Sequence, residues 1–169
     1  MTAEFINDEA GLAAFCDAIA DSDWLTVDTE FLREKTYYPQ LCLIQVASAS
    51  HVACIDPIAI KDLSSLLAIL YRPDITLVFH AARQDLELLY LLEGRLPSHV
   101  FDTQLAATAL GYGDQIGYGN LVKQCLGVEL EKAHSRADWS KRPLTDEQIA
   151  YAADDVIYLR DVYQLLLTQ

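Results

Sequence analysis

WLTVDTEF, at residues 24–31, alternates its side chains with the two-residue period of a β-strand that has one buried face. In such a strand Asp28 and Glu30 project to the same side, while their neighbours project to the other. Two carboxylates then share one small space, where a divalent cation can relieve their mutual repulsion by bridging them. The exposed polar face of an edge strand is the commoner explanation of a bare D-x-E. This segment alone therefore does not establish a metal site.

The segments next to this strand predict two further strands. Residues 8–21 carry apolar side chains at helical spacing and lead into it. LCLIQVAS at 41–48 and HVACIDP at 51–57 are apolar, β-branched runs separated by a few small residues, so we expect them to form a hairpin. The first half of the sheet is therefore largely antiparallel.

The second half of the chain alternates helices with strands. The expected elements are a helix near 62–71, a strand at 75–80, a helix near 82–93, a short strand at 99–102, and further helix ending at Gly127. Thr145 and Gln148 form a capping box that begins a long closing helix. Three antiparallel strands followed by parallel βα units predict an α/β fold with a mixed five-stranded sheet flanked by helices.

A third carboxylate, Asp85, lies within the expected helix near 82–93. Its helical neighbours are Ala81, Ala82, Leu88 and Leu89, so it belongs to the apolar stripe. Burying an isolated carboxylate is costly unless it is paired, protonated or bound to a metal. A cap interaction near the helix start explains this position about equally well.

The closing helix carries a fourth candidate. Tyr151 and Asp155 are four residues apart and share one face of the helix, so a phenol and a carboxylate can meet the same site. Asp154, three residues from Tyr151, is a rival, and helical spacing does not choose between the two aspartates. Such pairs are usually structural.

Length, hydrophobic fraction and net charge restrict the kind of protein that this chain can be. The chain of 169 residues is 52% hydrophobic, which suits one compact domain over residues 1–169. No stretch approaches the ~20 apolar residues that cross a bilayer, and no signal sequence begins the chain, so we expect a cytoplasmic protein without membrane contacts. The net charge of -13 argues against non-specific nucleic-acid binding. Carboxylates that bind cations soften this argument, as does the clustering of the basic residues Arg33, Lys35, Lys132, Arg136, Lys141 and Arg142.

Four segments, in order, resemble the catalytic domain of ribonuclease D, a member of the DEDD exonuclease superfamily. They are VDTEF at 27–31, YYPQLCLIQVA at 37–47, HAARQDLELL at 80–89 and RPLTDEQIAYAADDVIYL at 142–159. The resemblance implies a ribonuclease H-like fold and places the motif residues on Asp28, Glu30, Asp85, Tyr151 and Asp155. The tyrosine assigns the chain to the DEDDy branch and favours Asp155 over Asp154. Full-length ribonuclease D carries C-terminal helical HRDC domains, which we expect to be absent from residues 1–169.

The resemblance implies a two-metal 3′-to-5′ exoribonuclease. Two Mg²⁺ or Mn²⁺ ions, held by the four carboxylates, act on the 3′ end of single-stranded RNA such as tRNA precursors and release 5′-nucleoside monophosphates. Tyr151 orients the attacking water. Further substrate contacts are expected at Phe31, His80, Lys132 and Arg136, although packing explains Phe31 and His80 as well, and a solvated loop explains the basic pair.

Two alternatives remain at this stage. One is an exonuclease that acts on DNA or on short oligonucleotides, since nothing in the sequence identifies a contact to the 2′-hydroxyl. The other is a non-catalytic module that binds nucleic acid or protein on the same fold. No motif carboxylate is missing, which favours the enzyme. The sequence leaves homo-oligomerisation open.

Overall fold

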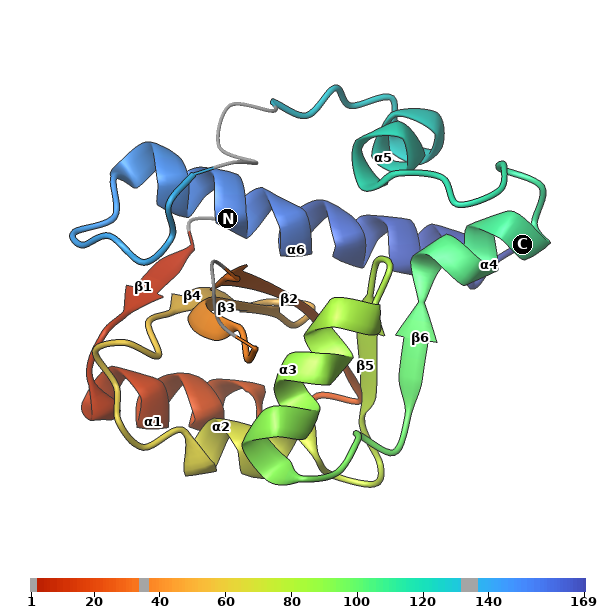
Figure 1. Ribbon diagram of the computed structural model, residues 1–169. Coiled ribbons are helices and arrows are strands. Elements are labelled where there is room, and N and C mark those ends of the chain that lie inside the picture. Colours follow the sequence, from red (N-terminus) through yellow and green to blue (C-terminus); the bar gives the residue numbers. More distant parts are fainter. Residues whose placement is uncertain (1–2, 34–36, 132–136) are drawn as a thin grey trace.

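A computed structural model describes residues 3–33, 37–131 and 137–169 (Figure 1). The strands are β1 (Glu4–Ile6), β2 (Trp24–Leu32), β3 (Gln40–Ala47), β4 (Val52–Ile55), β5 (Thr76–Phe79) and β6 (Val100–Asp102). The helices are α1 (Glu9–Ile19), α2 (Ser64–Leu70), α3 (Arg83–Glu93), α4 (Thr103–Ala109), α5 (Tyr118–Leu126) and α6 (Asp146–Leu166). Within the described residues, none of these helices is both long and apolar enough to cross a membrane.

The described strands form one mixed sheet in the order β1-β4-β3-β2-β5-β6. As predicted, β3 is antiparallel to both β2 and β4, and β5 and β6 continue the sheet in parallel from β2. The predicted fold class is confirmed, and the structure adds a sixth strand to the expected five. This strand, β1, pairs in parallel with β4 and places Ile6 opposite Ile55.

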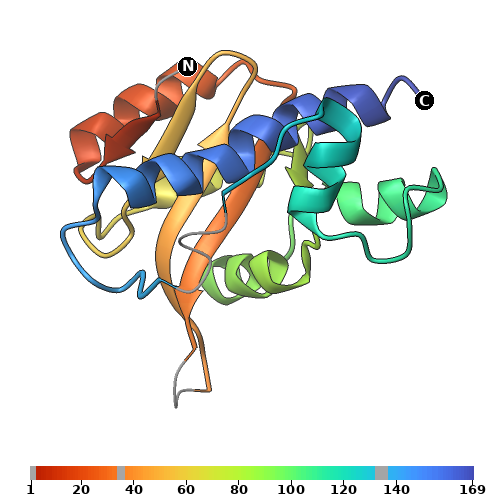
Figure 2. The same ribbon diagram turned by 90° about the horizontal axis from the view of Figure 1, so that it is seen from above.

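Strand alternation divides the core between the two faces of the sheet. One face packs against α1 and α2 through Leu25, Val27, Ile44, Val46, Ala53, Ile55, Leu12, Phe15, Ile19, Leu66 and Leu70. The other face packs under α6 through Cys42, Leu43, Ala47, Val52, Cys54, Ala152, Ala153 and Val156. Figures 1 and 2 show α6 lying across the strands on the face opposite α1 and α2. Asp28 and Glu30 alternate with Val27 and therefore lie on the α6 face.

The far end of β2 has an unusual environment. Strand β5 pairs with β2 only over Trp24–Thr26, so β2 has no β5 partner from Val27 onward. The ladder with β3 also shifts register between Glu30 and Phe31, which marks a β-bulge. Bulges are frequent next to active sites, because they redirect side chains and end regular pairing.

Helix α6 begins where the sequence predicted. The Thr145 side chain accepts a hydrogen bond from the Gln148 backbone, and the Gln148 side chain completes the capping box. Further along the helix, the Thr26 hydroxyl on β2 donates to the Val156 carbonyl over 2.9 Å. This buried bond fixes α6 to β2 immediately beside Asp155.

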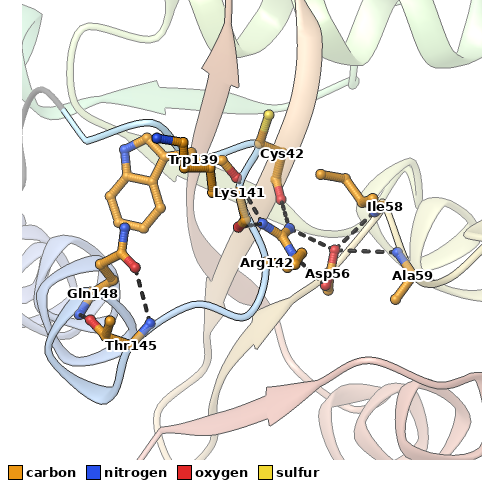
Figure 3. Close-up of polar contacts among 9 residues, drawn as sticks. All are labelled: Cys42, Asp56, Ile58, Ala59, Trp139, Lys141, Arg142, Thr145 and Gln148. Carbon is orange, nitrogen blue, oxygen red and sulfur yellow. Dashed lines mark hydrogen bonds and ion pairs between the residues drawn. The ribbon is translucent and has the colours of Figure 1, made fainter.

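A buried ion pair fastens the segment that leads into α6 to the sheet (Figure 3). Arg142 Nε and one terminal nitrogen donate to the two carboxylate oxygens of Asp56 over 2.6 and 2.7 Å. The same guanidinium donates to the carbonyls of Cys42, Trp139 and Lys141. Sequence analysis grouped Arg142 with basic residues that soften the acidic charge. In the structure its guanidinium donates to groups of the protein itself, so Arg142 holds the segment before α6 against the sheet.

Candidate metal centre

Three of the predicted carboxylates meet at one point. Asp28 and Glu30 project from β2, and Asp155 projects from α6. Each offers a carboxylate oxygen, and these oxygens all lie within 4.8 Å of one another. Of the two rival aspartates on α6, Asp155 belongs to this described group, and Asp154 lines the neighbouring clefts. The two-residue strand period and the crossing of α6 over β2 together create this cluster.

The fourth carboxylate, Asp85, lies beside the cluster. It is 7% exposed and accepts a 2.6 Å hydrogen bond from the Thr29 hydroxyl. Asp85 lies in the first turn of α3, whose N-cap residue Ala82 makes no side-chain hydrogen bond. Asp85 is not among the three residues that lie within 4.8 Å. Its charge is nevertheless close enough to raise the pKa of Asp28 and of Glu30.

The cluster is electrostatically strained without a cation. Burial, followed by the charges of the neighbouring carboxylates, raises the pKa of Asp28 well above its usual value and that of Glu30 to about 8. Burial also raises the pKa of Asp155 to about 7 and that of Asp85 to about 6. A set of carboxylate oxygens at such spacing fits a hard divalent cation, which prefers oxygen ligands and neutralises their charge.

Tyr151 lies one turn before Asp155 on α6. It is partly buried, and its ring stacks on Trp139 with the ring centroids 6.3 Å apart and the planes at 30°. Burial, followed by the charges of Asp155, Glu30 and Asp28, raises the pKa of Tyr151 to about 12. The phenol therefore stays protonated and carries a hydroxyl hydrogen beside the acidic cluster.

A small cavity adjoins the cluster. It measures about 140 Å³ and is lined by Asp28, His80, Tyr118, Asp155 and Leu159. Tyr118, which sequence reasoning missed, donates its hydroxyl to the backbone carbonyl of Asp155 over 2.7 Å. It thereby links α5 to the turn of α6 that carries the carboxylate. No sequence signal pointed to this contact, because its partners are 37 residues apart.

The residues predicted to contact substrate lie in different surroundings. His80 lines the cavity, but its Nε2 lies 3.0 Å from the Ile116 carbonyl and its Nδ1 lies 3.0 Å from the Thr103 hydroxyl. Both ring nitrogens therefore have protein partners, and burial lowers the pKa of this histidine. Phe31 follows the β-bulge, pairs with Leu41 and is partly exposed. Lys132 and Arg136 lie outside the described residues.

One backbone feature positions Asp85. Ala81, between β5 and α3, has a φ of 58°, in the left-handed region. The Asp102 carboxylate accepts hydrogen bonds from the backbone N–H groups of Ala81 and Ala82, both over 3.0 Å. Asp102 also caps α4 by accepting a hydrogen bond from the backbone N–H of Gln104. A single carboxylate thus fixes the turn that aims α3 at the free edge of β2.

In this protein, carboxylates from a central strand of the sheet and from a helix that crosses its face lie together. This arrangement is typical of nucleases with a ribonuclease H-like fold that bind metal ions through clustered carboxylates. More specifically, the chain belongs to the 3′-5′ exonuclease family, whose sequence profile matches residues 3–169. The resemblance to ribonuclease D, noted from the four motifs, is confirmed.

Individual relatives support this assignment. Ribonuclease D of Acidiphilium cryptum is 51% identical over 160 residues, which cover 94% of this chain and 41% of the relative. The crystal structure of Escherichia coli RNase D, described as an exoribonuclease involved in structured RNA processing, is 42% identical with a TM-score of 0.95. That match covers 99% of this chain and 45% of the other. Brucella melitensis NrnC bound to pGG is 29% identical with a TM-score of 0.82, over 99% of this chain and 81% of the other. The chain thus spans less than half the length of the ribonuclease D relatives described here.

Proposed function

We propose that residues 1–169 form a single exonuclease domain that removes 5′-nucleoside monophosphates from the 3′ ends of single-stranded RNA in a metal-dependent reaction. The observation that carries this proposal is the convergence of Asp28, Glu30 and Asp155, within 4.8 Å of one another, in a chain of the 3′-5′ exonuclease family. A non-catalytic role on this fold gives no reason to gather buried carboxylates whose mutual repulsion destabilises the free protein.

The residues present fit a pair of Mg²⁺ or Mn²⁺ ions. Asp28, Glu30 and Asp155 would hold them, with Asp85 as the fourth carboxylate. When bound, such ions activate water and offset the charge that develops on the phosphodiester. The carboxylates themselves must be deprotonated to bind, so protons compete with cations at this site.

Tyr151 takes the role of a hydrogen-bonding group. With a pKa of about 12 its phenol is protonated near neutral pH and is not available as a general base. A protonated phenol can still hold a water molecule by donating or accepting a hydrogen bond. The Trp139 ring stacks on the Tyr151 ring, and the Arg142 guanidinium donates a hydrogen bond to the Trp139 backbone carbonyl. These contacts support the proposal that Tyr151 orients the attacking water.

Two substrate classes deserve comparison. The ribonuclease D relatives, one of them described as an exoribonuclease involved in structured RNA processing, favour RNA. Within that class we propose tRNA precursors or other small RNAs. The NrnC structure bound to pGG favours short oligonucleotides as the second candidate. The net charge of -13 predicts weak binding of long RNA by this domain at physiological salt, because phosphate binding depends on basic surface.

The test is a degradation assay with 5′-labelled single-stranded RNA, DNA of the same sequence and an oligonucleotide of two or three residues. Each is incubated with Mn²⁺, Mg²⁺ or EDTA and resolved on a sequencing gel. We expect a ladder that shortens from the 3′ end of RNA with either metal and no cleavage with EDTA. Asp28→Asn should abolish the ladder. Asp154→Asn, which alters the adjacent aspartate of α6, should leave it.

Intact RNA and DNA in every lane, together with cleavage of the short oligonucleotide, would transfer the proposal to the second candidate. Intact substrate of all three kinds would contradict the enzymatic proposal and favour the binding module. Equal loss of activity in Asp28→Asn and Asp154→Asn would contradict the assignment of the metal ligands.

A further inference from the structure

Gln45 is the buried side chain whose chemistry the structure leaves unexplained. It lies in β3 and is 0% exposed. Neither its amide nitrogen nor its amide oxygen has a hydrogen-bond partner among the described residues. No other described side chain has a buried nitrogen or oxygen atom without a partner. An unsatisfied buried amide destabilises a fold, so natural proteins contain few of them. We therefore expect the amide of Gln45 to find a hydrogen-bond partner in the functional state of the protein. Without such a partner the side chain would only destabilise the fold.

The register of the sheet identifies the neighbours of Gln45. It lies directly opposite Asp28 in β2 and directly opposite Cys54 in β4. Opposed residues on adjacent strands point to the same face, with their Cβ atoms about 4.5–5.5 Å apart. Gln45 therefore lies on the face covered by α6, one strand away from the acidic cluster.

Of its two opposed neighbours, Asp28 is the one with complementary chemistry. Cys54 directs its thiol to the Ile149 carbonyl, with a sulfur-to-oxygen distance of 3.7 Å. A carboxylate accepts hydrogen bonds, and a glutamine amide nitrogen donates two. Leu43 and Ala47, its same-face neighbours along β3, are apolar, as is Val156 of α6. The Asp28 carboxylate is thus the acceptor that the amide of Gln45 is built to meet.

We propose that Gln45 is a positioning residue for the metal centre. Its amide N–H donates to the Asp28 carboxylate when that carboxylate ligates a cation, and it thereby fixes which oxygen faces the ion. Groups that hydrogen-bond a metal ligand in this way typically change metal affinity by about 10- to 100-fold when removed. The inference rests on the metal-dependent function proposed above, and it predicts opposite effects on the free and the metal-bound protein.

Gln45→Met is the variant that separates the two effects. Methionine has a similar volume and no amide, so it relieves the unsatisfied polar group. In EDTA we expect Tm to rise by about 2–4 °C. In isothermal titration calorimetry at about pH 8.5, with both proteins in the same buffer, we expect Mn²⁺ to bind about 10- to 100-fold more weakly than to the wild type.

The matched control is Cys54→Ala, which alters the neighbour on the other side of Gln45 and leaves Asp28 opposite it. Its Mn²⁺ affinity should stay within about twofold of the wild type. A second measurement uses the unaltered protein, so it does not depend on a variant that folds. Titration with Mg²⁺ should shift the side-chain amide resonances of Gln45 downfield, as a new hydrogen bond forms.

The outcomes are distinct. Wild-type Mn²⁺ affinity in Gln45→Met, with the amide resonances of the wild type unmoved by Mg²⁺, overturns the proposal. A loss of Tm with unchanged affinity assigns Gln45 a packing role only and also overturns it. If the wild type itself binds no Mn²⁺, the proposed function fails first and this inference falls with it. Weaker binding together with a higher Tm in EDTA supports the inference.

Discussion

The phenol of Tyr151 illustrates how the surroundings of one side chain restrict its chemistry. Burial, followed by the charges of Asp155, Glu30 and Asp28, makes a phenolate less favourable at this position. In the metal-free protein the hydroxyl therefore keeps its proton. The proposed contribution of this hydroxyl is a hydrogen bond to water, which has a measurable effect.

Tyr151→Phe removes this hydroxyl and keeps the ring that packs on Trp139. We expect the single-turnover rate on RNA to fall by about 10- to 100-fold, because the attacking water loses its orientation. Mn²⁺ affinity by calorimetry should stay within about twofold of the wild type, since no carboxylate is changed. A rate equal to that of the wild type would remove Tyr151 from the mechanism.

The individual site residues divide sharply into those that the sequence predicts and those that it does not. Asp28 and Glu30 follow from the strand period, and Asp155 from the motif on the closing helix. The hydrogen bond from Thr29 to Asp85 spans 56 residues, and the unpartnered amide of Gln45 has no signature at all in a strand of apolar neighbours. Local periodicity predicts the face on which a residue lies, but it does not predict which distant side chain meets it there.

The turn between β5 and α3 connects local backbone conformation with the position of Asp85. An alanine in the left-handed region is strained by about 1–2 kcal/mol, and here the Asp102 carboxylate holds it. We expect Ala81→Gly to raise the free energy of unfolding by about 0.5–1 kcal/mol, because part of the gain is offset by the greater freedom of glycine in the unfolded chain. Urea denaturation with EDTA present measures this change.

Asp102→Ala provides the matched comparison for this turn. It removes the acceptor of three backbone N–H groups, from Ala81, Ala82 and Gln104, so we expect a loss of about 2 kcal/mol or more. If Ala81→Gly destabilised the protein instead, the left-handed conformation would not be the one that the turn adopts in solution.

The segment between α5 and α6 depends on the pair of Arg142 and Asp56, whose side chains are 23% and 3% exposed. Although burial alone raises it, the hydrogen bonds from Arg142 hold the pKa of Asp56 below its usual value. Arg142→Ala should lower the free energy of unfolding by about 3–5 kcal/mol, because it leaves a buried charge unpaired. The double variant with Asp56→Ala should lose less than the sum of the single losses. Additive losses would show that the two side chains act independently.

Prediction of whole elements succeeded for the segments with a clear apolar or capping pattern and missed one short edge strand. The capping box located the start of α6, and the apolar runs located β2 to β5. Strand β1 was missed because only three residues pair with β4, and of these only Ile6 is buried. Helix α5 ends at Leu126, and the expected Gly127 is its C-cap in the left-handed conformation.

Across the molecule, the acidic cluster links stability to pH and to metal. A carboxyl whose pKa is raised on folding stabilises the protein fully below its unfolded pKa near ~4, and that contribution is lost as pH rises through the folded value. The folded values are about 6 for Asp85, about 7 for Asp155 and about 8 for Glu30. The pH window in which stability is lost therefore extends from about 4 to about 8.

We accordingly expect Tm in EDTA to fall as the buffer is raised from about pH 5 to about pH 8.5. Saturating Mn²⁺ should abolish most of that fall, because binding to the ionised cluster stabilises the folded state. Glu30→Gln should flatten the EDTA profile. A Tm in EDTA that rose steadily over this range would contradict the claim that folding raises the pKa values of these carboxyl groups.

The overall architecture was predictable because a mixed sheet needs only the order and period of its segments. The metal centre depends in addition on α6 crossing back over strands made early in the chain. Helix α6 contacts β2, β3, β4 and β5, and it brings Asp155 to carboxylates that are more than a hundred positions away. Such long-range closure is recorded in the motifs of the family and is not deducible from local propensity.

The position of Asp155 on the last helix has a consequence for how the protein is made. A ribosome extends the chain from its N-terminus, so every strand of the sheet emerges before α6 does. Until α6 emerges and packs on β2, Asp28 and Glu30 have no third carboxylate, and the face meant for α6 is bare. The proposed metal centre therefore stays incomplete in a nascent chain until α6 has left the exit tunnel. Synthesis of the sheet and completion of the site are separated in time by the length of chain between β2 and α6.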